Sequence, residues 1–208
     1  MLASWVIEEM KDLDLQDKRL NERLGAVLDM LGQRPNASIP AALDGGHTET
    51  TAAYRLFDNS KVGFENILAS HINATFERVS QQPTIVLVQD TTEVDLTRPE
   101  QQVKGAGLLD GHARYGEFLH PLMGFTPDGT PLGTMYAQIW TRDVEPKPQE
   151  ETGAGVDRKH IPIEEKESVR WLETQRYAQE VAQEIPQTQF IQLRSSESIQ
   201  PGARAPGT

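Results

Sequence analysis

The spacing of apolar residues predicts that the first part of the chain is helical. From Ser4 to Gly32, leucine and valine recur every three or four residues, which is the spacing of one buried helix face. Shorter helices are predicted at 40–43, 48–57 and 64–80, between breaks rich in proline, glycine and asparagine. The inward positions of the last helix are Ile67, Leu68, His71, Ile72, Ala74 and Phe76. An all-helical first domain is therefore predicted over residues 1–80.

After residue 80 the pattern becomes strand-like. The predicted elements are strands at 84–89, 118–126, 131–140 and 188–193, with a helix at 163–185 before the last strand. Residues 84–89 are a continuous apolar run rich in β-branched side chains, typical of a strand buried on both faces. The turn formers at 127–130 predict that the second and third strands form a hairpin.

The order of these elements predicts a mixed sheet. A hairpin followed by a helical crossover is the opening half of a ribonuclease-H-like fold, so the class is α+β or α/β with an incomplete sheet of this kind. Other α/β folds begin in the same way, so the order alone does not decide the fold. The predicted division is a helical domain at 1–80, a partial sheet domain at 81–193 and a disordered tail at 194–208. Within the second domain we expect a loop at 98–116 and an exposed insertion at 141–162.

Composition narrows the location and the partners. The chain has no cysteine, which excludes disulfides and thiolate metal sites and makes a cytoplasmic location the expectation. It has no apolar run of about 18 residues, so no membrane contact is expected. Its start also lacks the pattern of a secretory signal. The formal net charge of −11 counts against nucleic-acid binding, although a local basic patch can lie on an acidic protein.

Asp90 is the acidic residue with the most suggestive position. It directly follows the predicted strand at 84–89, and active sites of α/β folds gather at such strand ends. A carboxylate there can bind Mg²⁺, which prefers hard oxygen ligands and serves phosphoryl chemistry. A working site needs two or three acids from different elements. The alternative is a strand-end aspartate that caps a turn.

Histidines and glycines add no second chemical site. His112, His120 and His160 lack the spacing of metal ligands, and most lone histidines are structural or surface groups. No glycine-rich phosphate loop follows a strand and opens a helix, and there is no nucleophile elbow.

Basic residues mark two of the predicted helices. Lys18, Arg19 and Arg23 could contact phosphates from one helical face. The alternative is a solvated face with pairs of opposite charge four residues apart. On a later helix, the corresponding alternative is that Tyr54 packs and Arg55 is an ordinary surface residue.

Seven segments give these features a common interpretation. They are residues 17–24 (DKRLNERL), 34–40 (RPNASIP), 53–59 (AYRLFDN), 87–93 (LVQDTTE), 119–122 (LHPL), 126–133 (TPDGTPLG) and 163–172 (IEEKESVRWL). In this order they resemble the bacterial insertion-sequence transposases of the DDE class, specifically the Tn-five/IS-four type. The resemblance extends over roughly residues 5–193.

The resemblance implies a helical domain that binds transposon-end double-stranded DNA, followed by a ribonuclease-H-like catalytic core. It also implies Mg²⁺ as the cofactor and a homodimer as the family's possible assembly. The first catalytic aspartate of the family falls on Asp90, which would also be a metal ligand. The DNA-contacting positions of the family fall on Lys18, Arg19, Arg23, Tyr54 and Arg55.

The chain departs from the family at the second acid. Where the family has an aspartate after the strand at 190–193, this chain has Arg194 or Ser195, and serine cannot replace an anionic ligand. The family's glutamate lies farther downstream. We therefore expect a truncated transposase that is inactive by itself. The alternatives are a DNA-binding module that competes with the full-length enzyme, or an α/β protein unrelated to nucleic acids. Exposed apolar surface beside 190–193 predicts low solubility.

Overall fold

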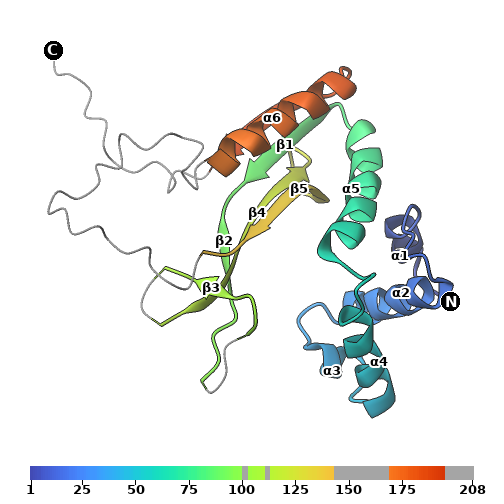
Figure 1. The fold of residues 1–208 in the computed structure, drawn as a ribbon. Coiled ribbons are helices and arrows are strands. Elements are labelled where there is room, and N and C mark those ends of the chain that lie inside the picture. The colour runs from blue at the N-terminus through green and yellow to red at the C-terminus, as the bar shows by residue number, and fades with distance from the viewer. Residues whose placement is uncertain (100–102, 111–112, 143–168, 195–208) are drawn as a thin grey trace, which may run out of the picture. The chain divides into compact units, whose positions relative to one another are not determined.

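The chain forms two units, each with its own secondary-structure class. The computed structural model describes residues 1–99, 103–110, 113–142 and 169–194. The units are Met1–Arg78 and Val79–Thr208. Figure 1 shows helices in the first and a mixed sheet in the second, which confirms the predicted mixture of helices and a mixed sheet. Among the residues described, no helix combines the length and the apolar character needed to cross a membrane.

The first unit contains more helices than predicted. They are α1 (Ser4–Glu9), α2 (Lys18–Gln33), α3 (Ile39–Ala42), α4 (His47–Phe57) and α5 (Phe64–Ser80), whose last two residues lie beyond the unit boundary. The single helix predicted from Ser4 to Gly32 is wrong, because the chain breaks between α1 and α2. Gln16 has a φ of 56°, and Asp17 caps α2 by accepting a 2.9 Å hydrogen bond from the Arg19 amide. A new helix start therefore interrupts an apolar spacing that continues through it.

Apolar side chains from α2, α4 and the connecting segments form the core of the first unit. The buried members are Leu15, Leu24, Val27, Leu43, Ala53, Leu56 and Val62. Leu15 comes from the break between α1 and α2, so this turn is part of the core. Each helix buries one stripe of its surface, and the opposite faces of α2 and α4 remain exposed.

The second unit is built around one long central strand. Its elements are β1 (Thr84–Gln89), β2 (Thr92–Asp95), β3 (Gly107–Leu108), β4 (Tyr115–Phe125), β5 (Pro131–Trp140), α6 (Val169–Glu184) and β6 (Gln189–Arg194). The predicted hairpin is confirmed as the antiparallel pair β4–β5. The prediction of a loop over 98–116 is wrong in part, since β3 and the start of β4 lie in it. The sequence also gave no indication of β2, a short polar strand that pairs with β4.

The strand pairing places two distant parts of the second unit side by side. β4 pairs antiparallel with β1, β2, β3 and β5. β6 pairs parallel with β1, from Thr84 opposite Gln189 to Gln89 opposite Arg194. β1 and β6 therefore end at the same edge of the sheet, and Asp90 is the residue that leaves β1 there.

The helix α6 packs against β1 and β5, and Figure 1 shows it alongside the sheet. Its Ala178 and Val181 are buried, as are Leu87 and Leu122 of the sheet. Alternate residues of β6 are exposed instead. Ile191 and Leu193 are 43% and 50% exposed, so apolar surface lies where the sequence predicted it. The low solubility inferred from this surface stays a prediction.

Candidate nucleic-acid interface and strand-end site

The first turns of α2 present three cations to solvent. Lys18, Arg19 and Arg23 are exposed, whereas Leu24 and Val27 of the same helix are buried in the core. Arg19 and Arg23 are four residues apart and therefore lie one above the other on the helix surface. All three side chains are accessible, and contact with phosphates stays a prediction.

The side chains of two of these cations have no partner in the part of the chain that the structure describes. Lys18 lies 3.6 Å from Glu22, in an exposed pair that contributes little to stability. The side chains of Arg19 and Arg23 form no hydrogen bond or ion pair with any other residue that the structure describes. Their guanidinium groups are consequently available to an outside anion.

The helix α4 carries the other predicted pair. It buries Ala53 and Leu56 in the same core as α2, and α2 and α4 pack against each other. Tyr54 is 52% exposed, so the alternative that it packs inward is wrong. Arg55 is also exposed, and its side chain has no bonded partner within the described part of the chain. Two packed helices therefore supply the five predicted DNA contacts.

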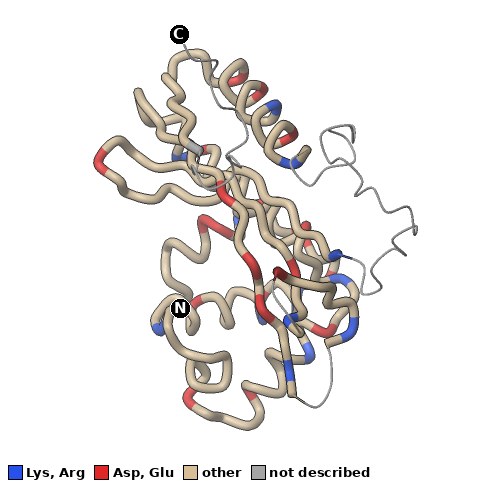
Figure 2. The backbone as a smooth tube through the Cα atoms, turned by 90° about the vertical axis from the view of Figure 1, so that its left-hand side faces the viewer, with Lys and Arg blue, Asp and Glu red and all other residues tan. Residues whose placement is uncertain are grey.

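Other cations of this unit are engaged. Arg34 is paired with Asp44 at 2.5 Å, and Lys11 with Glu77 at 2.6 Å. Lys61 donates to a backbone carbonyl oxygen. Acidic and basic residues are interspersed along the backbone instead of forming a basic block (Figure 2). Among the described residues of this unit, the arginine side chains without a bonded partner are therefore those of Arg19, Arg23 and Arg55.

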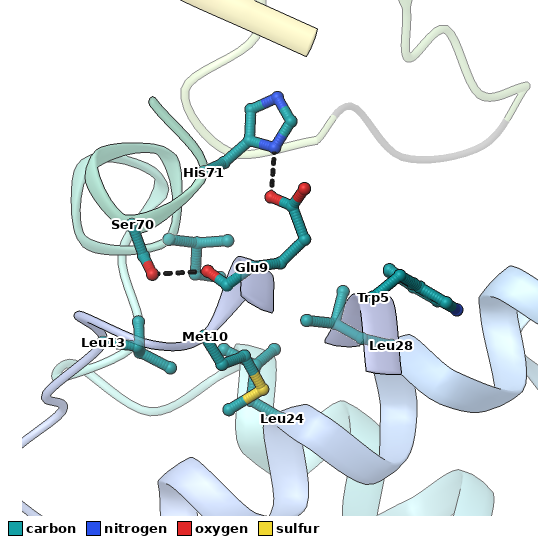
Figure 3. A pocket seen from close by; sticks show the side chains of 9 residues that line it. Trp5, Glu9, Met10, Leu13, Leu24, Leu28, Ser70 and His71 are labelled. Atoms are coloured by element: carbon teal, nitrogen blue, oxygen red, sulfur yellow. Dashed lines mark hydrogen bonds and ion pairs between the residues drawn. The ribbon is translucent and has the colours of Figure 1, made fainter. Parts of the chain in front are cut away.

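An apolar cavity lies between α1, α2 and α5, away from these arginines. Its volume is about 270 Å³, and its walls include Trp5, Met10 and Leu28 (Figure 3). The Glu9 carboxylate at its side is already held by His71 at 2.6 Å and by Arg78 at 2.8 Å. Those bonds fasten α1 to α5.

In the second unit, Asp90 stands at the end of β1 with an exposed side chain. Its Oδ1 accepts a 2.8 Å hydrogen bond from the amide of the next residue, Thr91. Among the described residues, no cluster of three acidic or histidine side chains could hold a metal ion. The nearest acids of the following strand, Glu93 and Asp95, are bound to Arg114 at 2.6 and 3.0 Å.

The carboxylate of Asp95 already accepts several hydrogen bonds within the protein. Hydrogen bonds from Thr97, followed by one from Arg114, lower its pKa to about 2. Arg114 also donates to the Asp110 carbonyl oxygen at 2.9 Å. The donor set around Asp90 therefore does not fit Mg²⁺ in this part of the chain. Ser195, where the family has its second acid, lies outside the described residues.

His120 is a buried residue of the sheet and not a surface group. It lies on β4, fully buried, and its ring meets Trp171 edge-on at a centroid distance of 4.7 Å. Burial lowers its pKa, against the opposing effect of Asp90 and with a smaller lowering effect from Arg170. A neutral ring is therefore favoured near pH 7. His112 and His160 fall outside the described residues.

A stack of cations and rings joins β4, β5 and α6, which the sequence did not reveal. The Arg142 guanidinium lies 4.1 Å from the Phe118 ring centre, and Arg170 lies 4.0 Å from that of Trp140. The two rings stack on each other at 5.4 Å. The stack fixes the end of β5 against the first turn of α6. Its members are far apart in sequence, so no local pattern could have indicated it.

Comparison with protein families bears on the first unit. Residues 2–62 match the family model of transposase DNA-binding domains. This segment contains α1 to α4 and all five predicted DNA contacts on α2 and α4. The match supports a transposase with DNA as its partner. No curated protein matches the chain.

Proposed function

We propose that the transposase DNA-binding segment, residues 2–62, docks on transposon-end double-stranded DNA through α2 and α4. The observation that supports this most directly is the state of Arg19, Arg23 and Arg55. All three are exposed, and none of their side chains is bonded to a described residue. One guanidinium group can donate two parallel hydrogen bonds to the oxygens of one phosphate. Three unbonded guanidinium groups can therefore form a phosphate-binding surface.

Tyr54 and Lys18 complete the proposed surface. The Tyr54 hydroxyl can donate to a phosphate, and its half-exposed ring can pack on a sugar. Lys18 adds a cation whose bond to Glu22 is weak enough to exchange for a phosphate. Phosphate contacts orient a protein on DNA but do not distinguish sequences.

For the second unit we propose a ribonuclease-H-like core of the Tn-five/IS-four type. The supporting features are the antiparallel set β1, β4 and β5, then the crossover α6, then β6 parallel to β1. In that arrangement Asp90 occupies the position of the first catalytic acid. These pairings match the order expected from the sequence.

We further propose that this chain alone does not cut DNA. The described residues offer Asp90 without acidic neighbours free to share a metal ion. The residues at and after the end of β6 are Arg194 and Ser195, and neither is an anion. Mg²⁺ therefore remains a family expectation, and no cleavage step is assigned to these residues.

DNA binding without cleavage favours a second candidate function, competition. A chain that occupies transposon ends but cannot cut them would block a complete transposase from the same DNA. Two observations favour this candidate. The first unit has unbonded arginines, and in the second unit Asp90 has no described acidic neighbour that is available to share a metal ion. The homodimer of the family is a further expectation, to be measured from the mass of the DNA complex.

The test is a gel shift of the full chain on the inverted repeats that flank its gene. The expected result is a shift stronger than that on scrambled DNA of the same length, weakening steeply as salt is raised. No nicking is expected with Mg²⁺ or Mn²⁺, and excess chain should slow cleavage by a complete transposase. Equal binding to scrambled DNA would contradict end recognition, and metal-dependent nicking would contradict inactivity.

A further inference from the structure

We infer that His120 is a positioning residue for Asp90, because it holds the side chains of the residues on both sides of it. This inference rests on the proposed assignment of Asp90 as the first acid of a catalytic core. The ring Nδ1 lies 2.8 Å from the Thr91 hydroxyl oxygen, and Nε2 lies 3.3 Å from the Gln89 amide oxygen. A single imidazole thus connects residues 89 and 91 across the strand end.

With the Gln89 amide oxygen facing the ring, as in the structure, one assignment of the two hydrogen bonds follows. The Gln89 amide oxygen can only accept, so the hydrogen of the neutral ring is on Nε2 and is donated to that oxygen. Nδ1 then has a free lone pair and accepts from the Thr91 hydroxyl. One tautomer of the neutral ring satisfies both contacts at once.

The surroundings keep this bridge in place. His120 and Gln89 are both fully buried, and Trp171 of α6 packs edge-on against the ring. Rotation of the imidazole would therefore break two hydrogen bonds inside a packed interior. Thr91 is half-buried, and its amide donates to Asp90 Oδ1 at 2.8 Å.

The consequence is an exposed carboxylate on a fixed support. Asp90 itself projects to solvent, but the side chains before and after it are tied to the neighbouring strand β4. Functional groups reach a reproducible direction when hydrogen bonds behind them restrict their backbone. A phenylalanine could fill much of the space of His120, but it could form neither bond.

The experiment uses this difference and follows the Thr91 amide, which is bonded directly to the Asp90 carboxylate. Amide hydrogen exchange is measured by NMR in the full chain and in His120→Phe, His120→Asn and Thr91→Val. We expect exchange at residue 91 to be roughly fivefold to tenfold faster in His120→Phe and Thr91→Val. His120→Asn should keep most of the protection, since its side-chain oxygen can accept from the Thr91 hydroxyl.

Leu122→Val is the matched control, because Leu122 is a fully buried residue on the same face of β4. It should lower overall stability without a specific effect at residue 91. Unchanged exchange in Thr91→Val and in folded His120→Phe would overturn the inference, as would equal acceleration in the control. If His120→Phe does not fold, Thr91→Val decides alone. Absence of a DNA shift would defeat the proposed function and leave this measurement unaffected.

Discussion

Three arginines on the outer surface of the first unit differ from Arg114 of the second unit in how their side chains are bonded. The side chains of Arg19, Arg23 and Arg55 are exposed and have no bonded partner among the described residues. In the second, Arg114 binds Glu93, Asp95 and a carbonyl oxygen. The same type of side chain is therefore unbonded at these three positions and an internal crosslink at Arg114, and Arg34 and Arg78 of the first unit belong with the crosslinked group.

The difference shows why net charge is a poor guide to the partners of this chain. A formal charge of −11 predicts repulsion of DNA, yet charges beyond about 10 Å are largely screened at physiological salt. The attraction or repulsion of DNA depends instead on which charged side chains near the contact surface are already paired. An acid that is already bound to an arginine repels DNA less than its formal charge suggests, and an unpaired arginine attracts it without losing an internal bond.

The largest effect is expected when the three unbonded arginines are replaced together, which tests whether they contact DNA. Arg19→Gln, Arg23→Gln and Arg55→Gln in one chain should weaken end binding roughly 10- to 100-fold at moderate salt. The slope of log affinity against log salt should fall by about 3, one unit for each lost phosphate contact. Gel shifts at several salt concentrations measure both. An unchanged slope would show that the α2 and α4 surface does not contact phosphates.

The complementary change removes an engaged arginine. Arg114→Gln leaves Glu93 and Asp95 without their shared cation, so the thermal midpoint of the second unit should fall. DNA affinity should stay the same, because the lost charge was not available to phosphate. Circular dichroism melting and the same gel shift measure the two effects. A loss of DNA binding equal to that of the first variant would remove the distinction between the units.

Acid should weaken the engaged cluster selectively. The pKa of Asp95 is about 2 in the folded chain, against 3.8 for the free side chain. The stabilisation is therefore complete above about pH 4 and is lost as pH falls towards 2. Asp95→Asn should flatten this part of the stability curve. Arg114→Gln should retain much of the slope, because the Thr97 hydrogen bonds are the largest cause of the shift. Equilibrium unfolding at a series of pH values provides the measurement.

The smallest effect is expected at Lys18. Its weak ion pair is intermediate between the unbonded arginines of α2 and α4 and the fully bonded Arg114. Its 3.6 Å contact with Glu22 is exposed, so Lys18→Gln should reduce DNA affinity by about twofold to fivefold. Glu22→Gln should raise affinity slightly by freeing the lysine. Measured affinities that move in the same direction in both variants would show that this pair acts through helix stability and not through charge.

The sequence was informative wherever one local pattern determined the outcome. The helix at Phe64–Ser80 and the strands Thr84–Gln89 and Pro131–Trp140 have the predicted bounds, since apolar spacing and turn residues mark both ends. The break before Lys18 was missed because Leu13 and Leu20 fit one continuous helical spacing. The Asp17 cap and the positive φ of Gln16 override that spacing.

The candidate residues were accessible to the sequence to different degrees. The sequence could place Lys18, Arg19 and Arg23 on one helix, but the absence of bonded partners for the two arginine side chains among the described residues is a property of the fold. Glu93 and Asp95 gave no indication of their engagement with Arg114, because that bond joins β2 to the residue before β4. The bridging role of His120 depends on strand register, which single-sequence spacing does not specify.

The parallel pair β1–β6 has a consequence for how the chain is made. The Thr188 hydroxyl donates to the Gln82 carbonyl across 106 residues of sequence. During synthesis, β1 must wait for β4, β5 and α6 to appear before β6 can cover its open edge. Pairing over such a distance slows folding, because a long loop must close first. The edge of the apolar strand at 84–89 therefore stays exposed in the nascent chain until β6 has been synthesised. During that time the chain is most prone to self-association.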